Sequence, residues 1–295
     1  MSNYIGRFAP TPSGPLHEGS LVAALASWLD ARAHGGRWLV RIEDLDTPRN
    51  EEGAPLIILG QLAICGLVSD EEPLVQSDRI AAYEDALLQI ADAGQVYPCG
   101  CSRREVEQVL VTLGFLQERD DERVYPGTCR GGLLGKPARS MRVLVTLGGE
   151  DITIRWSDRR LGRQRQNLTR EVGDFIIKRA DGVFAYQLAV VVDDAHQGIT
   201  HIVRGEDLVD NTPRQIHLQR LMGLSEPQYL HTPLVMGIDG HKLSKHNGAA
   251  PLDVSDPVAA LQQAARVLEL PRIEALSVSE WLAAATRSWA TRWVV

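Results

Sequence analysis

Hydrophobic and polar positions at the start of the chain change between the spacing of a strand and that of a helix. Residues 3–9 form a short strand-like run that ends at Pro10, which has no N–H to donate to a sheet. From Leu16 the apolar residues recur at helical spacing up to two glycines at 35–36, a typical helix end. Residues 38–44 form a second strand-like run. This order predicts a βαβ unit, which implies a parallel sheet with a right-handed crossover.

The same patterns predict the elements of the rest of the chain. Helical spacing is present around residues 51–65, 78–93 and 210–222, and again after Asp253. Strand signals are present at residues 141–160, 183–193, 199–204 and 229–238. The span 95–140 matches neither pattern, because glycine and proline interrupt it.

A stripe of large residues marks the C-terminal helical region. Trp281, Ala285, Trp289 and Trp293 recur every four residues, which places them on one side of a helix. We interpret this stripe as a packing surface rather than a binding site.

Composition places the chain among ordinary globular proteins. It has 295 residues, of which 44% are hydrophobic and 23% charged, and at roughly 150 residues per domain this suggests about two domains. The formal net charge of −7 does not favour nucleic-acid binding, so any contact with nucleic acid needs a local patch of basic residues. The sequence shows no apolar signal segment and no run of about 18 apolar residues, so we expect no membrane contact and a cytoplasmic location.

The loop at residues 10–20 is the first candidate for phosphate binding. It is rich in proline and glycine and leads His17 to the N-terminus of a predicted helix. Unpaired N–H groups and the helix dipole attract phosphate at such a position. The residues alone fit equally well with a proline-rich connector whose histidine caps the helix.

The segment at residues 241–246 is the second candidate. Lys242 and Lys245 lie on either side of Ser244, just after a Gly-Asp-Gly turn, and two such lysines can clamp a polyphosphate. The chain has only four lysines, which favours a functional role over a solvated loop tip.

Together the two segments resemble the HIGH and KMSKS motifs of class I aminoacyl-tRNA synthetases. Residues 17–20 match the first motif and residues 242–246 match the second. Three further stretches resemble the glutamyl and glutaminyl branch of that family: residues 7–14, 41–46 and 203–208. Glu18 departs from the family pattern, which has an apolar residue there, and we expect its carboxylate to point away from the phosphates.

The resemblance implies a fold and a domain organisation. The fold would be α/β, with a Rossmann-like class I synthetase catalytic domain formed by residues 1–94 and 175–253. Residues 95–174 would be an inserted zinc-binding subdomain of the acceptor-binding type, and residues 254–295 a short helical C-terminal region.

The resemblance also implies a reaction and its site residues. ATP, with Mg²⁺, would activate L-glutamate as glutamyl-adenylate without tRNA. His17 and Lys245 would be catalytic, because they would stabilise charge that builds on the phosphates. The implied ATP-binding residues are His17, Gly19, Ser20, Lys242, Ser244 and Lys245. The implied glutamate-binding residues are Arg7, Phe8, Ala9, Pro10, Thr11, Glu43, Tyr186 and Arg204. Among them, Arg7 and Arg204 would pair with carboxylates and Glu43 with the ammonium group.

Three cysteines in the irregular span suggest a structural metal site. Cys99, Cys101 and Cys129 are spaced as thiolate ligands of zinc would be. No histidine occurs between residues 35 and 195, so the fourth ligand could be Tyr125, an acidic residue, water or Cys65. Similar shortened members of the glutamyl branch place a tyrosine in this role, and the resemblance implies Tyr125.

Chain length indicates which kind of member of the glutamyl branch the sequence resembles. After Lys245 there are 50 residues (295 − 245), which we expect to be too few for an anticodon-binding region. The chain therefore resembles truncated members of the branch. This implies a monomer that transfers glutamate to queuosine in the anticodon loop of tRNA(Asp). The alternatives are another glutamate-adenylating ligase and a non-catalytic, synthetase-like RNA-binding protein.

A cluster of basic residues offers a contact for that RNA. Six arginines lie between residues 155 and 170, and we predict that Arg159, Arg160 and Arg163 help to hold the RNA backbone. A solvated basic face explains the span almost as well.

Overall fold

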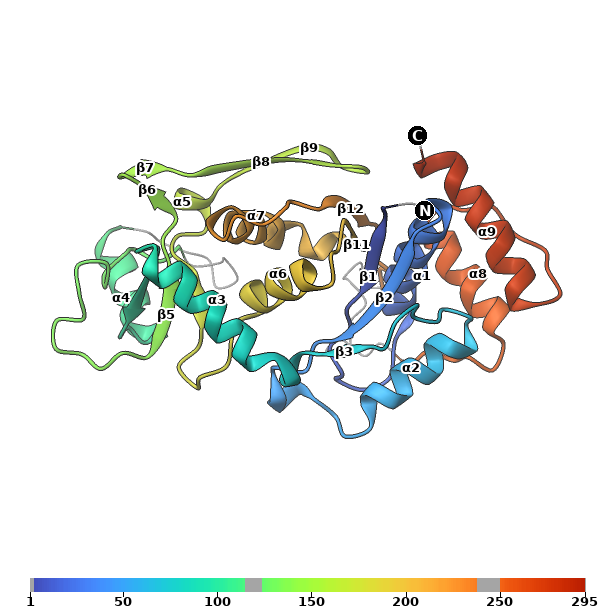
Figure 1. Ribbon diagram of the computed structural model, residues 1–295, viewed down its shortest axis with the longest axis horizontal. Helices are drawn as coiled ribbons and strands as arrows, with labels where there is room; N and C mark the ends of the chain where they lie inside the picture. The colour runs from blue at the N-terminus through green and yellow to red at the C-terminus, as the bar shows by residue number, and fades with distance from the viewer. Residues whose placement is uncertain (1–2, 115–123, 238–249, 295) are drawn as a thin grey trace.

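A seven-stranded sheet lies at the centre of the computed structural model, which describes residues 3–114, 124–237 and 250–294 (Figure 1). In spatial order its strands are β3 (Leu74–Val75), β2 (Arg37–Ile42), β1 (Ile5–Phe8), β11 (His201–Gly205), β12 (Gln228–Thr232), β8 (Thr153–Asp158) and β9 (Gly162–Asn167). Neighbouring strands run parallel, except that β8 and β9 form an antiparallel hairpin at the sheet edge.

The predicted βαβ unit is confirmed. Strands β1 and β2 pair in parallel, and α1 (Glu18–Ala33) connects them. Side chains of β2 alternate between two apolar cores: Trp38 and Val40 pack with α1, whereas Leu39 packs on the opposite face of the sheet. This alternation follows from the two-residue period of a strand.

Helices cover both faces of the sheet (Figure 1). The core with α1 also receives α2 (Ala54–Ile64), α8 (Pro257–Val267) and α9 (Val278–Trp293). The opposite core receives α3 (Ile80–Asp92), α6 (Tyr186–His196) and α7 (Thr212–Leu221). In the described residues, short 3₁₀ helices lie in the connections: η1 (Thr47–Arg49), η2 (Gln76–Arg79) and η3 (Glu206–Asn211). Within the described residues, no helix has the length and apolar character needed to cross a bilayer.

The strand predicted for residues 183–193 is wrong, because this segment contains most of helix α6. Its apolar run, residues 188–191, is almost completely buried. Periodicity cannot separate a buried strand from a buried helix in so short an apolar run. The helix packs against α3 and α7, and these tertiary contacts are not visible in the local sequence.

The predicted insertion at residues 95–174 is only partly separate from the central sheet. A second sheet is formed by β4 (Val96–Cys99), β5 (Ser140–Val143) and β10 (Ile176–Lys178). Near it lie α4 (Arg103–Thr112), the paired strands β6 (Thr146–Leu147) and β7 (Glu150–Asp151), and α5 (Leu168–Glu171). Helix α4 was not expected in the irregular span, although Ser102 and Glu105 form a capping box at its start. The β8–β9 hairpin leaves this region, because Asp158 pairs with Tyr229 and so extends the central sheet.

The tryptophan stripe of α9 is a packing surface, as predicted. Trp281, Ala285 and Trp289 are at most 1% exposed and belong to the same core as α1. The Trp289 indole N–H donates to the buried Asp30 carboxylate of α1 at 2.8 Å. The C-terminal helices therefore complete the core on this face of the sheet.

Candidate active site

A cavity of about 660 Å³ opens at the carboxyl ends of β1, β11 and β12. In open parallel sheets, ligands bind at this edge. Ten residues expected to bind ATP or glutamate line it: Arg7, Phe8, Ala9, Pro10, Thr11, His17, Gly19, Ser20, Tyr186 and Arg204. Among the described residues, Glu43 is the expected site residue that does not line the cavity. Lys242, Ser244 and Lys245 lie outside the described residues.

His17 caps helix α1 and also lines the cavity, so its capping role is compatible with the predicted phosphate contact. Its Nδ1 accepts a hydrogen bond from the Ser20 backbone N–H at 3.3 Å. Glu18 lines a separate groove next to α8, which agrees with the expectation that its carboxylate points away. The start of α1 therefore presents an imidazole and the small residues Gly19 and Ser20 to the cavity, an arrangement suited to phosphate.

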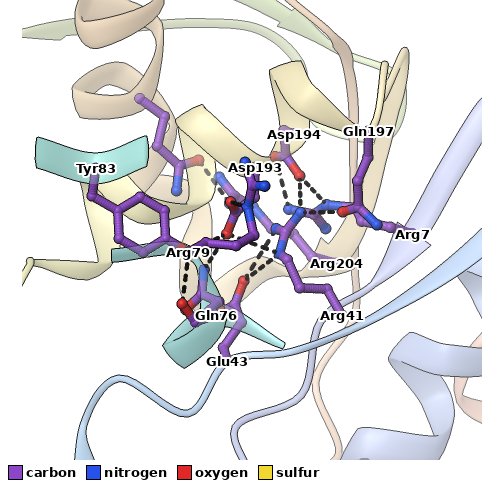
Figure 2. A network of polar contacts seen from close by, with 11 residues as sticks. Arg7, Arg41, Glu43, Gln76, Arg79, Tyr83, Asp193, Asp194, Gln197 and Arg204 are labelled. Carbon is purple, nitrogen blue, oxygen red and sulfur yellow. Dashed lines mark hydrogen bonds and ion pairs between the residues drawn. The ribbon is translucent and has the colours of Figure 1, made fainter. Parts of the chain in front are cut away.

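A network of buried charges adjoins the cavity through Arg7 (Figure 2). The fully buried Arg41 lies at its centre and donates to Asp194 at 2.7 Å and to Glu43 at 3.1 Å. Arg7 donates to the same Asp194 carboxylate at 3.0 and 3.3 Å. Because breaking a buried ion pair is costly, these pairs fix β1, β2 and α6 relative to one another.

Asp193 extends this network to a further part of the chain. Its carboxylate accepts hydrogen bonds from Arg79 at 2.7 Å and from Gln76 and Tyr83 at 2.8 Å each. It thereby joins α6 to η2 and α3. Sequence reasoning missed both aspartates, although two acids directly after the apolar run 188–192 were an available signal. Acids buried beside such a run need donors from elsewhere in the protein.

Arg7 and Glu43 have partners that the sequence did not predict. The guanidinium of Arg7, expected to receive a substrate carboxylate, binds Asp194 instead. The carboxylate of Glu43, expected to receive an ammonium group, accepts two hydrogen bonds from Arg41. Burial raises the pKa of Glu43, and the nearby cations Arg41 and Arg7 offset only part of that effect. Both side chains thus have partners inside the protein, and a contact of either with glutamate stays a prediction.

Arg204 differs from Arg7 and Arg41, because within the described part of the chain it has no acidic partner. It is 4% exposed and lines the cavity. Its guanidinium donates to Gln215 and Thr212, each at 2.8 Å, and to the imidazole of His231 at 3.1 Å. A buried cation whose partners are not acidic attracts an anion strongly, since the surroundings screen its charge weakly. Arg204 is therefore the cavity group best suited to a carboxylate.

Tyr186 completes the polar lining from the start of α6. Burial raises its pKa, which keeps the phenol protonated and able to donate. Within the described residues its hydroxyl makes no hydrogen bond, so that donor is available to a ligand.

The three predicted zinc-ligand cysteines lie together, at the end of β4 and in the loop around residue 129. The sulfur atoms of Cys99, Cys101 and Cys129 are all within 4.8 Å of one another, and Cys101 and Cys129 are 3.4 Å apart. Thiolates bound to one zinc at about 2.3 Å would lie about 3.8 Å apart, so the spacing fits a tetrahedral site. The Tyr125 hydroxyl lies 3.3 Å from the Cys99 sulfur and 3.6 Å from the Cys101 sulfur.

The chemistry of this cluster also fits a metal. Burial would raise the pKa of Cys99, but hydrogen bonds from Tyr125, from the Cys101 backbone and from Arg142 lower it to about 7. The thiolate is the form that binds metal. Cys65 takes no part, because it is buried in the core with α1 and α2, where burial raises its pKa to about 11.

Two of the three arginines predicted to contact RNA form ion pairs within the protein. Arg159 donates to Asp30 at 2.6 and 2.9 Å, and Arg160 binds Glu206 and the His231 carbonyl. Arg163 is exposed on β9, and two further exposed arginines, Arg155 and Arg165, face each other across the hairpin. Contact with RNA stays a prediction. The exposed residues best suited to it are Arg155, Arg163 and Arg165.

The family of the chain is shown by a match over most of its length. Residues 5–258 match the family described as "tRNA synthetases class I (E and Q), catalytic domain". A glutamate tRNA ligase from Elizabethkingia meningosepticum, solved in complex with its amino acid, superposes with a TM-score of 0.76 at 26% identity. That comparison covers 95% of this chain and 64% of the ligase, so the chain spans less than two thirds of that protein. The chain is a class I synthetase of the glutamate and glutamine branch.

More similar relatives narrow the assignment. A protein from Leptothrix cholodnii named "Glutamyl-Q tRNA(Asp) synthetase" is 57% identical over 98% of this chain and 97% of its own length. A protein of the same name from Burkholderia cenocepacia is 56% identical over the same shares of both chains. The chain belongs to the glutamyl-Q tRNA(Asp) synthetase family.

The buried network makes Arg41 a residue on which stability depends. We predict that Arg41→Met lowers the free energy of unfolding by about 3–5 kcal/mol, because Glu43 and Asp194 both lose a buried partner. Urea denaturation measures this change.

Arg37→Met is the matched control, because Arg37 lies on the same strand but pairs with Glu71 at the exposed surface. It should cost at most about 1 kcal/mol. Equal costs for the two variants would contradict the role given to the buried network.

Proposed function

We propose that this protein activates L-glutamate with ATP and transfers the glutamyl group to queuosine in the anticodon loop of tRNA(Asp). The observation that carries the proposal is that one cavity combines the N-terminus of α1 with Arg204, a cation that no acid of the described residues neutralises. The first suits a polyphosphate and the second a carboxylate. The names of relatives more than half identical over nearly the whole chain support the choice of acceptor.

The geometry suggests how activation proceeds. An oxygen of the glutamate carboxylate attacks the α-phosphorus of ATP, and the bond to the bridging oxygen breaks as pyrophosphate leaves. His17 and the α1 N-terminus would stabilise the charge on the phosphates, while Arg204 and Tyr186 would orient glutamate. The resemblance assigns Lys242, Ser244 and Lys245 to the same phosphates, and Mg²⁺ is expected to accompany them. A nucleophilic group of queuosine then attacks the acyl carbon, and AMP leaves.

The β8–β9 hairpin is the proposed contact for the RNA backbone. Arg155 and Arg165 lie directly opposite each other, and like charges in this arrangement are mutually destabilising. Within the described residues neither they nor Arg163 form an ion pair. A phosphate group near these side chains would relieve that repulsion.

Transfer of labelled glutamate tests the proposal. We predict incorporation into tRNA(Asp) that contains queuosine, with no incorporation above background into queuosine-free tRNA(Asp) or into tRNA(Glu). Equal labelling of queuosine-free tRNA(Asp), or charging of tRNA(Glu), would contradict the proposed acceptor.

Reversing the charge of Arg163 distinguishes RNA contact, measured by glutamate transfer, from glutamate activation, measured by ATP–pyrophosphate exchange. Arg163→Glu should raise the KM for tRNA by about tenfold at moderate salt, because it removes one phosphate contact and adds a repulsion. It should leave ATP–pyrophosphate exchange unchanged. Arg266→Glu, an exposed arginine on α8, is the control and should change neither value.

We further propose that the three cysteines and Tyr125 hold one structural zinc ion. The metal would tie the β4 end to the loop around residue 129 and supply folding energy to the inserted subdomain. Its role is structural, because Cys99 and its neighbours form a small core of their own, separate from the two cores beside the central sheet.

Metal analysis tests this site. We predict about one zinc ion per wild-type chain and less than about 0.2 in Cys101→Ser, which loses a thiolate ligand. Cys65→Ser is the control and should keep the wild-type content. Less than about half an equivalent in unchelated wild-type protein would contradict the zinc site, as would full zinc content in Cys101→Ser.

A further inference from the structure

Asp158 and His231 form a buried pair that contacts Arg204 from within the protein. The Asp158 carboxylate lies 2.7 Å from His231 Nδ1, and neither side chain has measurable exposure. His231 Nε2 in turn lies 3.1 Å from Arg204 Nε. None of the motifs recognised in the sequence includes either residue.

The hydrogen-bonding partners dictate which nitrogen of His231 carries the proton. The carboxylate of Asp158 can only accept, so Nδ1 must carry a hydrogen. The guanidinium of Arg204 can only donate, so Nε2 must offer its lone pair. Burial lowers the pKa of His231 more than its hydrogen bond to Asp158 raises it, which keeps the ring neutral. Hydrogen bonds from His231 and from the Leu161 and Arg160 backbones lower the pKa of Asp158 despite burial, which keeps the acid charged.

This arrangement holds Arg204 without neutralising it. His231 engages its Nε, Gln215 one terminal nitrogen and Thr212 the other. A guanidinium has five N–H groups, so one remains on each terminal nitrogen. One N–H on each of two adjacent terminal nitrogens is what a carboxylate needs for a two-pronged contact. An aspartate in direct contact with Arg204 would compensate its charge, whereas a neutral histidine orients it and leaves the charge available.

We infer that Asp158 and His231 are positioning residues, which fix the guanidinium of Arg204 in the orientation that receives a carboxylate of the substrate. The inference rests on the proposed function, in which that substrate is glutamate. The two residues come from β8 and β12, so the arrangement depends on the pairing of the hairpin with the central sheet.

Two substitutions of His231 separate its contacts. His231→Asn keeps a donor near the position of Nδ1 but has no acceptor that reaches Arg204. His231→Gln places an amide oxygen near the position of Nε2 and so preserves that acceptor. In glutamate-dependent ATP–pyrophosphate exchange, His231→Asn should raise the KM for glutamate by about tenfold or more and leave the KM for ATP within about twofold. His231→Gln should stay within about threefold of wild type for glutamate.

His217→Asn is the matched control. His217 is 4% exposed, bonds to the Leu144 carbonyl at 2.7 Å, and has its pKa lowered by burial, but does not line the cavity. Its loss should leave the KM for glutamate unchanged. The inference is overturned if folded His231→Asn keeps a KM for glutamate within twofold of wild type. It is also overturned if His217→Asn raises the KM for glutamate as much as His231→Asn does, or if His231→Asn raises the KM for ATP as much as the KM for glutamate.

A measurement on the wild-type protein decides the matter if His231→Asn does not fold. Nitrogen-15 NMR should find His231 neutral with its proton on Nδ1, and an imidazolium or a proton on Nε2 would overturn the inference. If wild type shows no exchange with glutamate, the proposed function fails instead, and the NMR result then tests the positioning of Arg204 by itself.

Discussion

The paired charges around Arg41 are the constraint on which the site depends. Arg41 has 0% exposure and can be accommodated only because Glu43 and Asp194 accept from it. The same Asp194 takes the charge of Arg7, and its neighbour Asp193 takes that of Arg79. These pairs connect β2 and η2 to β1 and α6, which supply Arg7 and Tyr186 to the cavity lining. The acids of the network pair with Arg7, Arg41 and Arg79. Among the described residues, none of them pairs with Arg204, which is buried in the cavity lining.

Buried aspartates act as junctions elsewhere in the fold as well. Asp30 on α1 accepts from Tyr4, Arg159 and Trp289, and so joins the residue before β1, the hairpin and the last helix. Asp174 accepts from Tyr97 of β4, from Arg130 and from the Val145 backbone. A carboxylate offers about four acceptor positions, which suits it to collecting donors from distant segments. Removal of such an acid would leave several buried donors without an acceptor.

Local signals in the sequence were sufficient for much of the fold and for part of the site. The βαβ unit, the loop with His17 and the tryptophan stripe depend on periodicity, on proline and glycine, and on motif resemblance. Helix α6 could not be predicted, because its buried apolar face looks like a strand until α3 and α7 are placed beside it. The partners of Arg7, Glu43 and Arg159 were hidden for a related reason. Arg7 and Arg159 pair with acids that other elements supply. Glu43 pairs with Arg41, only two residues before it, and a sequence shows charges without showing which of them pair.

Glutamate-dependent ATP–pyrophosphate exchange in the absence of RNA tests the central claim most directly, because it isolates the step performed in the cavity. The account predicts exchange by the wild-type protein with L-glutamate alone. It also predicts a loss of at least about 30-fold in kcat/KM for Arg204→Leu, equivalent to about 2 kcal/mol for a charged hydrogen bond. Exchange that requires tRNA, or that survives the loss of Arg204, would contradict the account.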